Sequence, residues 1–165
     1  MKNLSINKKL IIGFGSVLIL LIITSVISLI SINQIGNQTQ LYGQYTVPNL
    51  QYMYKMQIDM RAASQYLLNA IVEDTQGSTN AALNKVTSWG ADFNVQKEAF
   101  VANLRDDSLN KDIEKINEII VEAAAARNKI TELLANNNEE NKAQALELYL
   151  KKYEPAVNQV TDILE

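Results

Sequence analysis

The feature that most limits how this chain can fold is an uncharged apolar run over residues 10–32. A helix needs about 20 such residues to cross a bilayer, so the run is long enough for one membrane span. Lys2, Lys8 and Lys9 precede it, and the next charged residue is Lys55. Because cationic side chains stay on the cytoplasmic side of a span, the pattern predicts a cytoplasmic N-terminus and an extracytoplasmic remainder.

This reasoning predicts a protein of the cell membrane, with a cytoplasmic N-terminus at residues 1–9, a transmembrane helix at 10–32 and an extracytoplasmic domain at 33–165. The alternative is a cleaved signal peptide that begins with the lysines. The apolar run is longer than the usual core of a signal peptide, and there is no Ala-x-Ala cleavage site because the first alanine is Ala62. Both observations favour a retained membrane anchor.

The sequence lacks the residue types on which many enzymes depend. It holds no cysteine and no histidine, which excludes disulfides, thiolate metal sites, His-ligated zinc and His-based catalytic triads. The formal net charge is −3, and the lysines and arginines are scattered, which argues against a nucleic-acid partner. We therefore expect a protein that is not an enzyme and that needs no metal or cofactor.

Beyond the anchor, apolar residues recur every three or four positions without strand-like alternation. The pattern predicts an all-α fold with helices at about 33–74, 78–104, 109–135 and 139–165, the first of them continuous with the transmembrane helix. Four long helices with short connections are typical of an antiparallel up-down four-helix bundle.

The same spacing predicts which side chains face the core. The expected core residues are Thr46, Asn49, Met53, Met56, Met60, Ala63, Leu67 and Ala70 on the first helix; Leu83, Val86, Phe93, Phe100 and Leu104 on the second; Leu109, Ile113, Ile116, Ile120, Ala123, Ile130 and Leu134 on the third; and Leu146, Leu150, Tyr153, Val157, Val160 and Leu164 on the fourth. Arg127 interrupts the apolar stripe of the third helix.

Local signals mark the helix ends and two weak points. We expect Ser78 or Thr79 to cap the start of the second helix, and Asn137 the start of the fourth. Pro48 and Pro155 each remove one helix hydrogen bond, so both helices that contain them should bend or loosen nearby.

The predicted helix lengths indicate a longer parent protein. At 1.5 Å per residue, the first helix rises about 60 Å above the membrane, and a fourth helix that starts at Glu139 needs about 40 residues to return. The sequence stops at Glu165. We therefore expect a parent that continues into a second transmembrane span and a cytoplasmic output region.

Three stretches stand out around the anchor: the opening "MKNLSINKKLIIGF", the membrane-proximal "LYGQYTVPNL" and, in the fourth helix, "KAQALELYLKKYEPAV". All three resemble the N-terminal half of bacterial methyl-accepting chemotaxis receptors with a four-helix-bundle sensory domain. Their order and spacing around one anchor extend the resemblance over nearly the whole chain.

The resemblance implies a homodimer whose outer bundle binds a small solute, or a solute-binding protein, and moves the second membrane helix. In such receptors a HAMP linker passes the movement to a cytoplasmic coiled coil that controls a histidine kinase. The same outer module resembles input domains of sensor kinases and cyclases. A membrane-anchored helical spacer, or a protein-interaction domain without a small ligand, is the competing interpretation.

Arg61 is the leading candidate ligand contact, because a guanidinium binds a carboxylate through two parallel hydrogen bonds. It lies beside the expected core stripe, on a second stripe with Tyr54 and Gln65, which are further candidate contacts. The apolar part of that stripe is a candidate dimer interface, made of Val47, Leu50, Tyr54, Ile58, Leu68 and Val72. The family's amino-acid receptors gather several arginines there, and this chain matches one. A solvated arginine on a wide core-facing helix is the plain alternative.

Counting residues down from the distal end of the bundle brings Lys151, Lys152 and Tyr153 to about the height of Arg61. These three residues are candidate contacts for an anionic or amino-acid-like solute. Their plain interpretation is a solvated lysine pair beside a core tyrosine. Arg127 either extends its charge to solvent, pairs with an acid or contacts a ligand.

Overall fold

The computed structural model describes residues 5–136 and 138–165, and every regular element in them is helical. The chain forms two compact units, Met1–Gln44 and Tyr45–Glu165. The elements, in order, are α1 (Ile6–Leu41), a π-helical segment η1 (Tyr42–Thr46), α2 (Val47–Val72), α3 (Gln76–Ala102), α4 (Asn110–Leu134), α5 (Glu139–Leu148), a second π-helical segment η2 (Tyr149–Tyr153) and α6 (Glu154–Ile163).

Helix α1 contains the apolar run, and none of its residues is buried. Helical backbone continues through η1 into α2, and in the described residues this is the one helix long and apolar enough to cross a membrane. Side chains such as Leu20 and Ile27 are more than half exposed. Apolar residues on every side of a helix are typical of a span surrounded by lipid.

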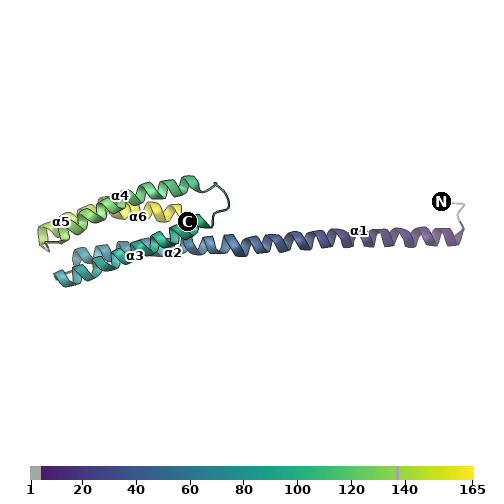
Figure 1. Ribbon diagram of the computed structural model, residues 1–165, viewed down its shortest axis with the longest axis horizontal. Coiled ribbons are helices and arrows are strands. Elements are labelled where there is room, and N and C mark those ends of the chain that lie inside the picture. Colours follow the sequence, from purple (N-terminus) through teal and green to yellow (C-terminus); the bar gives the residue numbers. More distant parts are fainter. Residues whose placement is uncertain (1–4, 137) are drawn as a thin grey trace. The chain divides into compact units, whose positions relative to one another are not determined.

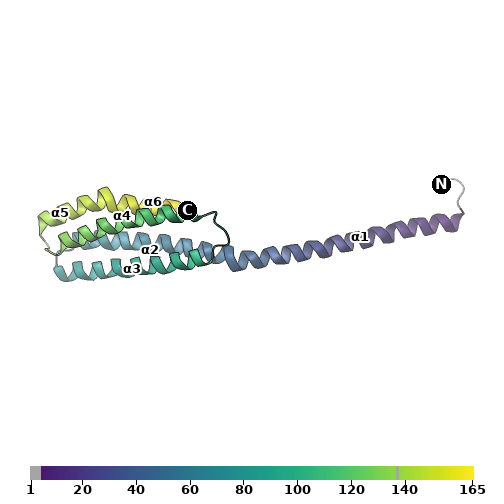
Figure 2. The same cartoon turned by 45° about the horizontal axis from the view of Figure 1, so that its top comes forward.

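The second unit is a four-helix bundle, in which α5, η2 and α6 together form the fourth helix. Figures 1 and 2 show α2 beside α3, and α4 beside the α5–α6 helix. Helix α2 also packs against α5 and α6, so both helix pairs contribute to one core. Residues 73–75, 103–109 and 135–138 connect the four helices.

Most of the predicted core is confirmed. Met56, Met60, Ala63, Leu67 and Ala70 of α2 are buried, at the predicted spacing of three and four residues. A large side chain buried in this way stabilises the fold by about 1.5–3 kcal/mol. The predicted core residues that are buried in the other helices are Val86, Phe93, Phe100, Ile116, Ala123, Ile130, Leu134, Tyr153, Val157, Val160 and Leu164.

The core prediction is wrong for three residues. Leu109 is 37% exposed because it precedes the first turn of α4. Leu146 and Leu150 are 36% and 52% exposed, and their neighbours Ala145 and Tyr149 are buried in their place.

The π-helical turn of η2 explains the shift at Leu146 and Leu150. A π-helical turn holds one residue more than the α-helical turn it replaces. The residues that face the core before this turn therefore lie one position earlier in the sequence than a regular α-helix predicts. The cause is Pro155, which lacks an N–H and whose ring would clash with the carbonyl of Lys151. Pro48 stands in the same relation to η1, since each π-helical segment ends two residues before a proline. The predicted loosening at the two prolines therefore takes the form of two widened turns.

The N-caps of two helices are other residues than the predicted ones. The N-cap of α3 is Thr75, whose hydroxyl oxygen accepts a 3.2 Å hydrogen bond from the Ser78 amide, so α3 begins two residues earlier than predicted. Thr79 is instead buried inside the first turn. Asn137 lies outside the described residues, and Asn138 caps α5 by accepting from the Asn141 amide at 2.8 Å.

Candidate functional site

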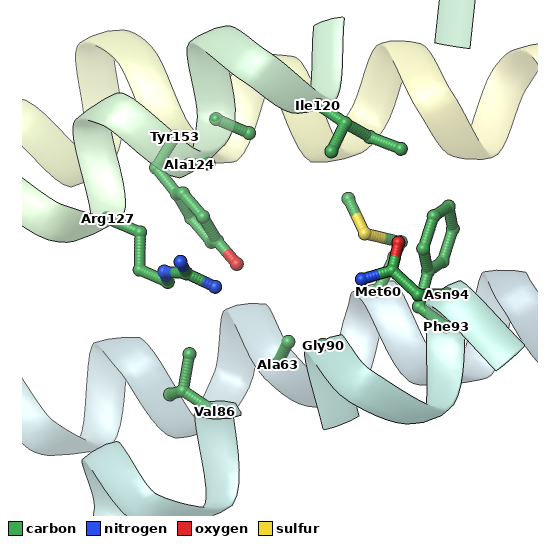
Figure 3. Close-up of a pocket in the computed structure, with 11 residues that line it drawn as sticks. Met60, Ala63, Val86, Gly90, Phe93, Asn94, Ile120, Ala124, Arg127 and Tyr153 are labelled. Carbon is green, nitrogen blue, oxygen red and sulfur yellow. The ribbon is translucent and has the colours of Figure 1, made fainter. Parts of the chain in front are cut away.

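A cavity of about 160 Å³ lies inside the bundle, partly open to solvent, between α2, α3, α4 and η2. Most of its wall is apolar and includes Met60, Val86 and Phe93. Figure 3 shows the guanidinium of Arg127 and the hydroxyl of Tyr153 pointing into the same space. The cavity therefore combines an apolar wall with a cation and a phenol.

Small residues on three helices make room for this cavity. Ala63 faces it from α2, Gly90 from α3, and Ala123 and Ala124 from α4. A Cβ atom added at Gly90 would stand 3.6 Å from Nη1 of Arg127, so the guanidinium lies over the bare backbone of Gly90. Longer side chains at these positions would fill the space.

Arg127 projects from α4 and is half-buried. Its Nη2 and Nε atoms donate to Oδ1 of the neighbouring Asn128, at 3.1 and 3.4 Å. No ion pair joins Arg127 to a carboxylate in the part of the chain that the structure describes. Because guanidinium carries five N–H donors, several remain for another acceptor.

Tyr153 is the last residue of η2 and is 4% exposed. Desolvation raises the pKa of its phenol to about 12, with a smaller opposing effect of Arg127 and a further raising effect of Tyr149. The phenol is therefore protonated at neutral pH and available as a hydrogen-bond donor.

Tyr149, the first residue of η2, connects the π-helical segment to α2. Its phenol and the hydroxyl of Ser64 form a buried 2.8 Å hydrogen bond. Burial raises the pKa of Tyr149, and the hydrogen bond with Ser64 opposes this rise in part. The rings of Tyr149 and Tyr153 lie 5.9 Å apart between centroids.

One acidic side chain is buried in the bundle outside the cavity wall. Asp59 of α2 is 6% exposed, and its pKa is raised by burial first and by the negative charge of Asp92 second, while Lys55 opposes the rise. No carboxylate belongs to the cavity wall as far as residues 5–136 and 138–165 are concerned.

The predicted ligand contacts do not gather at one place. The Arg61 side chain is 63% exposed, and its Nη2 stands 3.8 Å from Oε1 of Glu165. Tyr54, Gln65 and Lys152 are exposed as well.

The fourth-helix candidates point to different surroundings. The Lys151 ammonium contacts Oε1 of Glu147 at 2.6 Å, and that hydrogen bond lowers the pKa of Glu147. Tyr153 faces the cavity, where it meets Arg127 instead of Arg61. The predicted role as ligand contacts stays a prediction for all six residues, namely Arg61, Tyr54, Gln65, Lys151, Lys152 and Tyr153.

Asn94 and Gly90 are cavity residues that sequence reasoning did not find. The one signal that pointed to the cavity is Arg127, a charge within an apolar stripe. The void itself arises from small residues of different helices that meet only in the folded bundle.

The predicted second stripe of α2 is present as an exposed surface. Val47, Leu50, Tyr54, Ile58 and Val72 are between 41% and 65% exposed, and Leu68 is half-buried. Its role as a dimer interface stays a prediction.

Comparison with known proteins shows the family of this chain. The family described as "Four helix bundle sensory module for signal transduction", which is found in chemotaxis receptors, matches residues 3–165. No curated protein and no solved structure matches the chain. The match covers the long apolar helix and the whole bundle, and the chain therefore belongs to the four-helix-bundle sensory modules of signal-transduction receptors.

Proposed function

We propose that this chain is the extracytoplasmic input module of a membrane-anchored chemotaxis receptor, and that it reports the binding of a small solute. The family match over residues 3–165 carries the proposal. A bundle with an interior cavity and an arginine that lacks a carboxylate partner in the described residues supports it. The module has no enzymatic activity in this proposal, and its output is a change in its own helices.

The proposed topology places the N-terminus in the cytoplasm, α1 in the membrane and the bundle outside. The basic residues ahead of the apolar run support this orientation. The bundle is proposed to be antiparallel and up-down, which the short connecting segments support.

We also propose that two copies pair through the exposed stripe of α2. The stripe is largely apolar over more than six helical turns, from Val47 to Val72, and such a surface is typical of a protein interface. A symmetric pair would place α2 of each copy beside the same helix of its partner.

An alternative output is a sensor kinase or a cyclase, because the matched family is described by signal transduction in general. A protein-interaction or spacer role is a second alternative. The exposed α2 stripe favours this role, because it offers an apolar surface to another protein. The two kinds of role differ in whether a small solute binds.

The absence of cysteine makes topology and pairing directly testable. In intact cells, a membrane-impermeant maleimide should label Asn84→Cys in the bundle at once, but Asn7→Cys only after lysis. The reverse pattern would contradict the proposed orientation. In membranes, Ile58→Cys on the stripe should form disulfide-linked dimers, while the exposed control Val95→Cys on α3 should not.

Solute binding is testable with the full chain in lipid nanodiscs. Trp89 of α3 is the only tryptophan and packs against the core, so its fluorescence reports unfolding of the bundle. A solute that binds the folded state raises the thermal midpoint by mass action. A flat midpoint across amino acids, organic acids, amines and sugars would refute the sensing proposal and leave the spacer role.

A further inference from the structure

We propose that the cavity inside each bundle is a binding site for a small monocarboxylate with a short apolar tail, held by Arg127. The inference rests on the proposed sensing function and specifies where the solute binds and what chemistry it has. It places the site within one subunit, away from the exposed α2 stripe.

The charge of Arg127 selects an anion. Arg127 is half-buried and its guanidinium points into the cavity, yet the acceptor that the guanidinium meets in the described residues is the neutral amide oxygen of Asn128. Removing a cation from water is costly unless an acceptor compensates it. A carboxylate would accept two of the remaining N–H groups in parallel, which is the geometry that a guanidinium favours.

The other polar groups of the wall agree with this choice. Burial raises the pKa of Tyr153 to about 12, so at neutral pH its hydroxyl can donate to a second carboxylate lone pair. The amide of Asn94 enters from the opposite side of the cavity. Among the described residues, no aspartate or glutamate lines the site, so an ammonium group would find no counter-charge there. The wall therefore disfavours amines and gives the ammonium of an amino acid no ionic partner.

The volume and the wall set the size and polarity of the rest of the ligand. Cavities of about 150 Å³ lined by apolar side chains hold molecules of the size of benzene, and this cavity has about 160 Å³. Met60, Val86 and Phe93 offer an apolar surface to a short tail. Drug-sized ligands occupy roughly 300 Å³ or more, so long-chain acids are too large for this site.

The test uses the full chain in nanodiscs with three probes, namely acetate, propanoate and butanoate, measured by calorimetry and by the thermal midpoint from Trp89. Butanamide and butylammonium, at matched ionic strength, are the uncharged and cationic controls. We expect butanoate to bind and to raise the midpoint, and both controls to leave it unchanged. Failure of all three carboxylates to bind would overturn the inference.

Three variants locate the site. Arg127→Gln should weaken butanoate binding about tenfold or more, because it removes a charged hydrogen-bond donor. Lys129→Gln on the same helix is the matched control, since the side chain of that lysine is 61% exposed and lies outside the cavity, and the affinity of this variant for butanoate should stay within about twofold. Gly90→Leu should abolish binding by filling the space, while the better helix propensity of leucine supports the fold.

The outcomes separate this inference from the proposed function. If butanoate binds the wild type, Arg127→Gln and a folded Gly90→Leu with equal affinity, the cavity is not the site, while solute sensing stands. The same holds if another solute of the wider panel raises the midpoint and no carboxylate probe does. If no solute at all binds the wild-type chain, both the inference and the sensing proposal fail.

Discussion

The buried hydrogen bond between Ser64 and Tyr149 connects α2 to the π-helical segment, and its energy can be measured by a double-mutant cycle. The two oxygens are 2.8 Å apart, and both residues are buried. Ser64→Ala leaves the Tyr149 hydroxyl buried without this partner, which costs about 1–3 kcal/mol. Tyr149→Phe costs less, about 0.5–1.5 kcal/mol, because the Ser64 hydroxyl can turn to a carbonyl of its own helix.

The double variant should cost less than the sum of the two single variants, because it removes both polar groups together. We expect a coupling energy of about 1–2 kcal/mol, within the range found for residues in contact. Unfolding followed by Trp89 fluorescence is the assay, and for a domain of this size 1 kcal/mol corresponds to about 4 °C in the midpoint.

A matched control is Thr87→Ala on α3, whose exposed hydroxyl donates to the Leu83 carbonyl of its own helix at 3.1 Å. It should cost at most about 0.5 kcal/mol and show no coupling to Tyr149→Phe. Additive costs for Ser64→Ala and Tyr149→Phe would refute the reasoning, because the hydrogen bond would then contribute nothing to the packing of η2 on α2.

Three further substitutions test the bundle. Burial and the charge of Asp92 raise the pKa of Asp59 above its ordinary 3.8, so the stability that its proton provides is present at low pH and is lost as pH rises through the folded-state pKa. Asp59→Asn should therefore raise the thermal midpoint at pH 7 and flatten the stability profile above about pH 4; a lower midpoint at pH 7 would contradict this. Gly90→Ala should add about 0.5–1 kcal/mol to the free energy of unfolding, because the new Cβ meets its nearest atom at an ordinary 3.6 Å, and a destabilised variant would show that the site resists even one methyl group. Ile130→Ala, at a fully buried position, should cost about 2–5 kcal/mol in denaturant titrations, whereas Val121→Ala on the exposed side of the same helix should stay within about 0.5 kcal/mol; equal costs would mean that the inward face of α4 is assigned incorrectly.

The α2 core could be predicted from the sequence because a regular helix converts spacing directly into direction. Met56, Met60, Ala63 and Leu67 recur at four, three and four residues and are all buried. The same rule failed in the fourth helix, where Leu146 and Leu150 look like better core residues than Ala145 and Tyr149. A proline is visible in a sequence, but whether the helix responds by bending or by widening one turn depends on the packing around it.

The cavity could be predicted only in part. Arg127 stands out in the sequence as a charge in an apolar stripe, whereas Arg61 stands out because the chain around it has so few charges. The structure separates the two arginines, since Arg61 is largely exposed beside Glu165 and Arg127 points into the cavity. The two arginines differ in which helices surround them. A sequence alone does not show which small residues of different helices meet in the folded bundle.

The void itself has an energetic meaning for a sensory module. A closed, dry cavity lowers stability by about 24 cal/mol per Å³, which for about 160 Å³ gives an upper bound near 4 kcal/mol. The opening to solvent reduces that cost, yet Gly90 and the alanines around it still leave space that larger side chains would fill. A solute bound as proposed would restore part of the missing contact, and it would do so between α2, α3, α4 and Tyr153 at the end of η2. Its binding would therefore change the packing of η2, the segment of the fourth helix whose hydrogen bonding already departs from the α-helical pattern.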